Sequence, residues 1–261
     1  MKTFLWFAKT SQMLLLLFFL ISCQNNSENN MIRTKHGWKE FVVNRKGDSV
    51  MIIYNSNKQK RSEISFKNKL YDGVGYNYYL NGKVKNEIHY KKGKKNGIAK
   101  WYYKNGKLYQ LTTYKNGKKN GIRKKYYKDG KLEAEMFYKD NIPQPGLKEY
   151  REDGSLITKY PQIHFKEVNK LAFENKYYLD VYLKPKGKNT SFYRIKNIDG
   201  EDFEIALPKG PKKGVRRITY LLRPGEILMK KIRIKAITTT KHGNPVILYK
   251  TYRLSVENRF N

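Results

Sequence analysis

Few side chains in this sequence have the types and spacing that catalysis or metal binding requires. The four histidines, His36, His89, His164 and His242, stand far apart, and none is near the lone cysteine, Cys23. Metal sites built from His and Cys use short ligand spacings. The sequence also lacks a nucleophile elbow, a phosphate loop and a dinucleotide fingerprint. We therefore expect no catalytic residue, no metal and no cofactor, and hence a protein that is not an enzyme.

Lysines beside aromatic residues are the one recurring combination with a chemical use. The chain has 55 Lys and Arg against 22 Asp and Glu, which gives a formal charge of +33. Lysines crowd two segments that lie 24 residues apart, the length of a sequence repeat. We expect these segments to meet at one edge of a sheet and to attract anions there. This set, the predicted ridge, comprises Lys91, Lys92, Lys94, Lys95, Lys115, Lys118 and Lys119.

The charge also has an explanation that needs no ligand. Of the 55 basic residues, 43 are Lys and only 12 are Arg. Arg binds phosphate and carboxylate groups bidentately, whereas Lys is a hydrated point charge, so a solvated Lys-rich surface would have the same composition. An aromatic stripe expected beside the ridge has two explanations as well: contact with a ligand, or filling of the hydrophobic side of a thin sheet. Its members, expected in matched strand positions, are Tyr79, Trp101, Tyr103 and Tyr127.

A 24-residue repeat positions these side chains. The triplet Asn81-Gly82-Lys83 returns as Asn105-Gly106-Lys107 and as Asp129-Gly130-Lys131. Asn-Gly between two aromatic-rich runs predicts a β-hairpin with both turn residues at positive φ. A second turn, expected over 116–121, leads into the next unit, so successive hairpins should form one antiparallel meander. In the second strand of each unit we expect a more apolar face with Ile88, Thr112 and Met136, and a partly exposed face with Glu87, Leu111, Glu133 and Glu135.

The repeat resembles the bacterial variant of the MORN repeat. The resemblance covers about residues 49–158 and is carried in each unit by a Gly, a Tyr and the Asn/Asp-Gly-Lys turn, followed by a segment such as 114–121, Tyr-Lys-Asn-Gly-Lys-Lys-Asn-Gly. It implies an extended single-layer β-sheet and a role in interaction or scaffolding. Some bacterial relatives are described as antitoxin-like.

The amino-terminal segment resembles the export signal of bacterial lipoproteins. A charged start precedes an apolar stretch over 13–21, which is too short to count as a membrane-spanning helix. Leu20-Ile21-Ser22-Cys23 resembles a lipobox, in which the cysteine receives a diacylglycerol. We therefore predict a signal peptide at 1–22, lipid attachment at Cys23 and a flexible tether at 23–31. No Asp follows the cysteine, which favours the outer membrane of a bacterial cell envelope.

The remaining sequence divides into two domains. The repeat ends before residue 160, so we predict a repeat domain at 32–159 and a second domain at 160–261. Short apolar runs between Pro and Gly turns in the second domain predict a small β-sandwich. The expected fold class is all-β, an elongated antiparallel meander of hairpin repeats followed by a small β-sandwich-like domain. The predicted strands of the sandwich are 177–183, 191–195, 203–207, 215–222, 227–237 and 246–256.

Two functional interpretations stay open. The first is a non-enzymatic envelope lipoprotein that reaches the membrane through its lipid anchor. Its repeat sheet would be an interaction or scaffolding surface for an envelope protein or an anionic glycolipid. The second is electrostatic binding of anionic lipids, glycolipids or nucleic acid, for which the charge of +33 is the only basis. Export argues against nucleic acid as the target.

Cys23→Ala should abolish acylation, because only the thiol can receive the lipid. Mass spectrometry of the wild-type protein should show a diacylglycerol on Cys23, and the variant should leave the detergent phase on detergent partitioning, since acyl chains supply membrane affinity. Ser22→Ala is the control and should behave as the wild type does. Equal partitioning of Cys23→Ala and the wild type would place the anchor elsewhere.

Overall fold

The computed structural model describes residues 31–43 and 48–259. The predicted signal peptide, Cys23 and nearly all of the predicted tether lie outside the described residues. The described chain is all-β, with an antiparallel meander followed by a second body of two small sheets, so the predicted fold class is confirmed. Within this part of the chain, no helix combines the length and the apolar character needed to cross a membrane.

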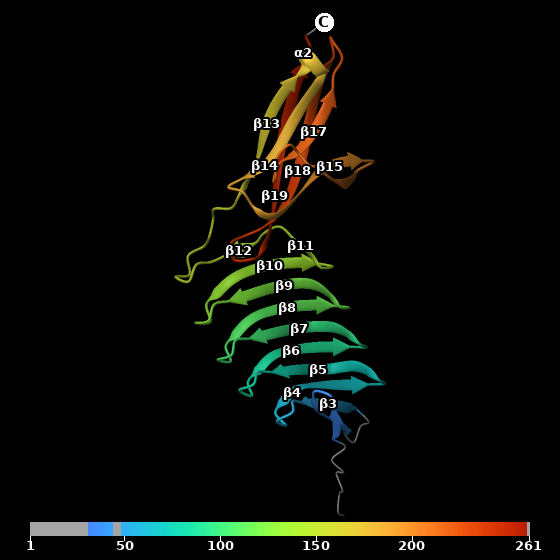
Figure 1. The fold of residues 1–261 in the computed structure, drawn as a ribbon, viewed down its shortest axis with the longest axis vertical. Coiled ribbons are helices and arrows are strands. Elements are labelled where there is room, and N and C mark those ends of the chain that lie inside the picture. The colour runs from blue at the N-terminus through green and yellow to red at the C-terminus, as the bar shows by residue number, and fades with distance from the viewer. Residues whose placement is uncertain (1–30, 44–47, 260–261) are drawn as a thin grey trace, which may run out of the picture.

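The meander is one antiparallel sheet whose strands lie across the long axis of the molecule and stack along it (Figure 1). Neighbouring strands follow one another in sequence, except that β12 pairs with β10. The strands are β1 (Ile32–Thr34), β2 (Gly37–Val43), β3 (Ser49–Tyr54), β4 (Lys60–Lys67), β5 (Leu70–Tyr78), β6 (Val84–Lys91), β7 (Lys94–Tyr102), β8 (Leu108–Lys115), β9 (Lys118–Tyr126), β10 (Leu132–Lys139), β11 (Ile142–Pro143) and β12 (Lys148–Glu149).

The turn inside each repeat has three residues and not the predicted pair at positive φ. The amide of Gly106 donates to the carbonyl of Tyr103 at 2.9 Å, and the amide of Tyr103 donates to the carbonyl of Lys107 at 2.8 Å. Only Gly106, with φ +93°, has positive φ; Asn105 does not. The side chain of Asn105 instead accepts from the amide of Lys107 at 3.0 Å. The predicted turn position is therefore right, but the predicted conformation of Asn105 is wrong.

The turn between repeats is the one with two positive φ angles. Lys115 pairs directly with Lys118, which leaves only Asn116 and Gly117 in the loop, at φ +50° and +84°. These angles match the tight hairpin turn that follows the twist of its strands. The second turn predicted over 116–121 is therefore shorter than expected, because residues from Lys118 onward already belong to β9.

One face of the meander is buried, as predicted. Ile88, Thr112 and Met136 are all buried, and a small cluster around Met136 forms the core of this sheet. Phe137 on the opposite face is exposed, which fits a single-layer sheet. Glu133 departs from the predicted partial exposure, since it is only 8% exposed. Its carboxylate accepts a hydrogen bond from the buried ammonium of Lys125 at 2.8 Å, and this partner makes burial of the charge tolerable.

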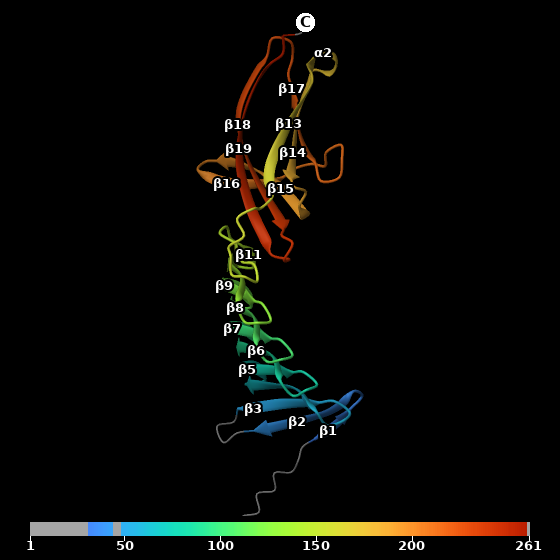
Figure 2. The ribbon, with the colours of Figure 1, turned by 90° about the vertical axis from the view of Figure 1, so that its left-hand side faces the viewer.

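The second body consists of two antiparallel sheets, and most of the buried hydrophobic residues of the described chain belong to it. In Figure 2 its long strands follow the long axis of the molecule, whereas the strands of the meander cross it. Leu179, Val181, Ile232 and Ile234 are fully buried at its centre. One sheet has the order β13-β14-β17 and the other β16-β15-β18-β19. The elements are β13 (Gln162–Lys170), α2 (Leu171–Glu174), β14 (Lys176–Lys184), β15 (Lys188–Ile198), β16 (Glu201–Ala206), β17 (Arg216–Leu221), β18 (Ile227–Thr239) and β19 (Pro245–Glu257).

Gly106→Val should lower the free energy of unfolding by about 1 kcal/mol or more, because a β-branched side chain is strained at the φ of +93° found here. Lys104→Val, at an exposed position of the same turn without positive φ, is the control and should cost much less. Chemical denaturation of both variants measures the difference. Equal stability of the two would show that residue 106 does not require the left-handed conformation.

Candidate interaction surface

Consecutive two-residue turns are joined at one edge of the meander. The amide of Gly117 donates to the carbonyl of Lys95 at 2.8 Å, and the amide of Asn116 donates to Asn96 Oδ1 at 3.3 Å. One repeat earlier, the amide of Lys92 donates to Asp72 Oδ2 at 3.0 Å. Each turn is thus bonded to the first strand of the strand pair that it follows. This stacking brings five exposed lysines to the same edge, which we call the turn lysines: Lys91, Lys92, Lys94, Lys115 and Lys118.

Two members of the predicted ridge lie elsewhere. Lys95 Nζ is 5.3 Å from the ring centroid of Tyr114, and Lys119 Nζ is 5.2 Å from that of Tyr138. Both lysines are half-buried, and each lies over a ring of the buried face. Burial lowers the pKa of Lys119, and the nearby charges of Arg123 and Lys95 lower it further. These two cations therefore stabilise the sheet through ring contacts and are less available to a ligand.

The turn lysines have no partner of their own within the described part of the chain. None of their ammonium groups forms an ion pair or a hydrogen bond among these residues, although the backbone amide of Lys92 donates to Asp72. At the opposite edge, the lysine that follows each three-residue turn differs, because its ammonium group donates to a turn of the next repeat. Lys83 Nζ donates to the carbonyl of Asn105 at 2.8 Å, and Lys107 Nζ donates to that of Asp129 at 2.9 Å. One edge of the meander therefore uses its lysines for structure, and the other leaves them to solvent.

The predicted aromatic stripe is a hydrogen-bonded ladder of three tyrosines, and it lies at the edge opposite the turn lysines and not, as predicted, beside the ridge. The hydroxyl groups of Tyr79, Tyr103 and Tyr127 donate to carbonyl groups of the next repeat at 2.6–2.7 Å. Trp101 does not belong to this ladder, so its predicted place in a matched position is wrong. It lies inside the sheet between Asn86 and Gln110. Because these hydroxyls are committed to the backbone, the ladder joins repeats and offers few polar groups to a ligand.

Acidic groups of the meander are neutralised by close partners. Glu87 accepts from Tyr102 Oη at 3.1 Å and from Lys100 Nζ at 3.2 Å, and it contacts the ring of His89 at 3.1 Å. Burial alone would raise the pKa of Glu87, but these three contacts together lower it. Among the residues that the structure describes, no three His, Cys, Asp or Glu side chains gather as metal ligands would. Asp72, which accepts from the amide of Lys92, offsets part of the charge of the turn lysines, and the row of five lysines keeps a net positive charge.

A buried polar contact joins the last repeat to the second body. Glu149 is 1% exposed, and its Oε1 accepts from the hydroxyl of Thr240 at 2.6 Å and from Nδ2 of Asn244 at 2.7 Å. Lys125 Nζ donates to the carbonyl of His242 in the same turn at 3.1 Å. The sequence does not predict this junction. Its one indication is the residue type at a matched repeat position, which is Trp101, then Lys125 and then the acidic Glu149.

Comparison with known proteins identifies the repeat. Three segments match the family of the MORN repeat variant, at residues 71–92, 95–116 and 119–140. Each segment spans one strand pair, β5–β6, β7–β8 and β9–β10, with the three-residue turn inside it and the two-residue turn at its end. The chain therefore contains three copies of this repeat, and the resemblance predicted for the rest of residues 49–158 stays a prediction. No curated protein matches the chain.

Glu149→Leu should weaken the contact between the second body and the meander. The substitution leaves the buried hydroxyl of Thr240 and the amide of Asn244 without an acceptor, at a cost of about 1–3 kcal/mol for each unpaired group. Glu152→Leu removes the same charge from an exposed position nearby and is the control. Hydrogen exchange should rise at residues 240–244 in the first variant only. Unchanged exchange there would mean that Glu149 does not hold the two parts together.

Proposed function

We propose that this chain is a non-enzymatic, lipid-anchored protein of the bacterial envelope. Its MORN-variant sheet is the interaction or scaffolding surface, and another envelope protein or an anionic glycolipid is its partner. Two findings support the proposal: the lipobox-like segment that ends at Cys23, and the three matched repeats, a type that typically serves protein interaction. The lipid anchor would hold the chain at the outer membrane without spanning it.

The observation that carries the proposal is the row of turn lysines. Five exposed cations from two consecutive turns lie at one edge, and Glu87, Glu133 and Glu135 of the sheet are already paired with other lysines. Like charges held close together repel each other, so the row does not stabilise the fold. An anionic partner would relieve this repulsion along the whole edge. The hydrogen-bonded turns supply the fixed spacing that such a partner would recognise.

Binding to anionic lipids, glycolipids or nucleic acid by charge alone is the alternative, and the same row favours it. Export argues against nucleic acid. The two functions differ in their response to salt, because the Debye length falls to about 3 Å at 1 M salt and exposed charges are then screened. A shape-complementary protein complex would persist at such salt. A pull-down from envelope extracts with stepwise salt elution therefore distinguishes a specific partner from binding by charge.

Replacing Lys91, Lys92, Lys115 and Lys118 by Gln should weaken binding to anionic vesicles by orders of magnitude at low salt, since each lysine near an anionic surface contributes about 1 kcal/mol. At high salt the difference should nearly vanish. Co-sedimentation in a Cys23→Ala background removes the contribution of the acyl anchor, and neutral vesicles measure residual apolar binding.

The matched control replaces four exposed lysines of the second body, Lys166, Lys170, Lys230 and Lys231, by Gln. Its net charge equals that of the first variant. If both variants lose the same affinity, total charge and not the row of turn lysines governs binding. If neither loses affinity, the row has no role in recognising anionic surfaces.

A further inference from the structure

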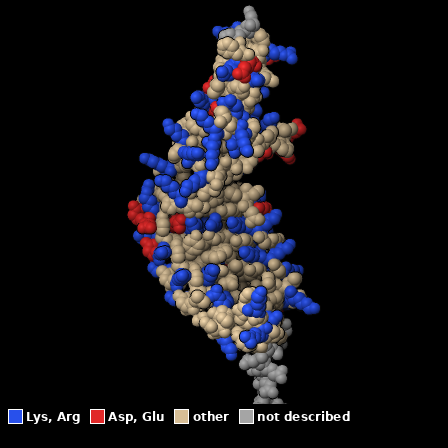
Figure 3. All heavy atoms as spheres, in the orientation of Figure 1, with Lys and Arg blue, Asp and Glu red and all other residues tan. Residues whose placement is uncertain are grey.

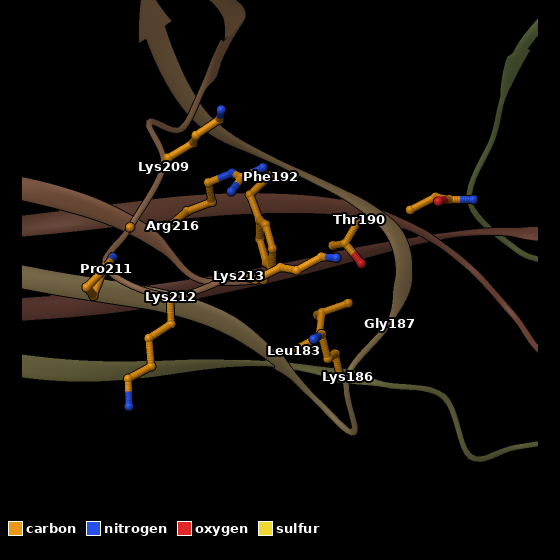
Figure 4. Close-up of a pocket in the computed structure, with 13 residues that line it drawn as sticks. Leu183, Lys186, Gly187, Thr190, Phe192, Lys209, Pro211, Lys212, Lys213 and Arg216 are labelled. Atoms are coloured by element: carbon orange, nitrogen blue, oxygen red, sulfur yellow. The ribbon is translucent and has the colours of Figure 1, made fainter.

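The second body contains a cavity of about 580 Å³ between two of its connections. The link from β14 to β15 forms one wall, and the link from β16 to β17 forms the other (Figure 4). This volume lies within the range of small-molecule sites, about 300–1,000 Å³. Five cationic side chains line the cavity, and no carboxylate does: Lys186, Lys209, Lys212, Lys213 and Arg216.

The five cations fall into an inner and a rim group. Lys213 extends toward Thr190, and Arg216 lies beside Phe192, whereas Lys209 and Lys212 point outward in different directions (Figure 4). The inner group is completed by Lys186 from the opposite wall. Cations of one sign in a concave site concentrate the electric field and raise the local concentration of anions.

Backbone contacts hold both walls in place. The amide of Val215 donates to the carbonyl of Lys212 at 3.1 Å, closing a turn with Gly214 at φ +90°, and the amide of Gly210 donates to the carbonyl of Val215 at 3.1 Å. On the other wall, Gly187 approaches Thr238 so closely that a Cβ there would lie 2.2 Å from the threonine hydroxyl oxygen. The cations therefore stand on ordered segments, so little ordering is needed when a ligand binds.

Several cations elsewhere in the second body form ion pairs, whereas those of the cavity form none in the described chain. Arg217 binds both carboxylate oxygens of Asp180 at 2.6 and 2.9 Å, and Lys235 Nζ is 2.6 Å from Glu204. The neighbouring Arg216 has only the carbonyl of Val215 as an acceptor, at 3.3 Å, within the described residues. None of the four cavity lysines forms an ion pair in this part of the chain. Figure 3 shows Lys and Arg side chains gathered over the second body near the meander.

The floor of the cavity adds a second chemical requirement. Phe192 and Leu183 are buried and line it with apolar surface, and the hydroxyl groups of Thr190 and Thr238 share a hydrogen bond of 2.9 Å at its end. A ring can lie against this apolar floor while charged substituents reach the inner cations. Several inner cations suit phosphate groups, which Lys binds as a point charge and Arg bidentately.

We propose that this cavity binds a phosphorylated ring compound, either a soluble sugar or polyol phosphate or the headgroup of a phosphorylated lipid. The site lies outside the repeats and is independent of the turn lysines. Phosphate relieves the repulsion among the inner cations, so binding depends on Lys186, Lys213 and Arg216 more than on the rim.

Inositol hexakisphosphate is a suitable probe, titrated calorimetrically into the full-length protein in neutral detergent at physiological salt. Lys186→Gln/Lys213→Gln should weaken binding about tenfold or more, since a charge-assisted contact is worth about 1.5–3 kcal/mol. The rim pair Lys209→Gln/Lys212→Gln should have a smaller effect. The control pair Lys230→Gln/Lys231→Gln removes the same charge from exposed positions of β18 that do not line the cavity, and it should change binding less than about twofold.

Loss of affinity that is equal in the inner and control pairs overturns the proposal, because net charge alone would then explain binding. Absence of binding by the wild type at physiological salt also overturns it. Protection of Lys186 and Lys213 from chemical acetylation by the bound probe, seen by mass spectrometry, supports the assignment directly. Since no turn lysine lines the cavity, failure here leaves the proposed function of the repeat sheet to be tested separately.

Competition distinguishes the two sources of the phosphate. Displacement of the probe by glucose 1,6-bisphosphate supports a soluble ligand, and displacement by vesicles containing a phosphorylated inositol lipid, but not by neutral vesicles, supports a headgroup. Displacement by neither overturns the assignment, because the cavity would then respond only to the high charge of the probe.

Discussion

The meander depends on hydrogen bonds that run from each repeat to the next, because a single-layer sheet has no second layer to cover it. Tyr79 and Tyr103 each donate to a carbonyl 23 residues further along the chain, and Lys83 to one 22 residues further. Every such bond requires a constant repeat length. Insertion of one residue would break them and would also turn the following side chains of that strand to the opposite face. The constancy of the 24-residue period thus follows from contacts between repeats and not from the hairpins alone.

The junction uses a repeat position for a different purpose. Trp101 lies inside the sheet, and the residue one repeat later, Lys125, donates to the turn between β18 and β19. One further repeat places Glu149 against the same turn. Buried polar contacts are directional and costly to leave unpaired, so they specify one arrangement where an apolar contact would accept several. The end of the repeat array is therefore adapted to hold the second body through polar residues in positions where the middle of the array has an aromatic one.

Much of the fold followed from the sequence, and the differences have physical causes. Asn105-Gly106 and Asn116-Gly117 are the same dipeptide, yet only the second forms a two-residue turn, because strand register decides how many residues remain in the loop. Spacing alone also could not show that Lys95 leaves the ridge for the ring of Tyr114. The six strands predicted in the second body are all present, but β13 was not predicted. Most of its residues are charged or polar and only Ile163 is fully buried, so the strand lacks a clear apolar pattern. The cationic cavity was not predicted, because Lys186 and the lysines of the link from β16 to β17 are far apart in sequence. Only the arrangement of the strands brings them together.

The basic residues of this chain act under two different electrostatic conditions. The turn lysines are exposed, so their field decays within about 8 Å at physiological ionic strength and attracts only a surface that comes close. The inner cations of the cavity line a concave site beside Phe192, which concentrates their field on a single small ligand, although Lys186 and Lys213 are themselves exposed and Arg216 is half-buried. The meander begins at the end nearest the predicted tether, and the second body lies at the far end (Figure 1). With a lipid anchor at Cys23, the repeats would lie nearer the anchoring membrane than the cavity. A ligand of the cavity would then come from the space beyond that membrane surface, which favours a soluble phosphorylated compound over a headgroup of the anchoring membrane itself.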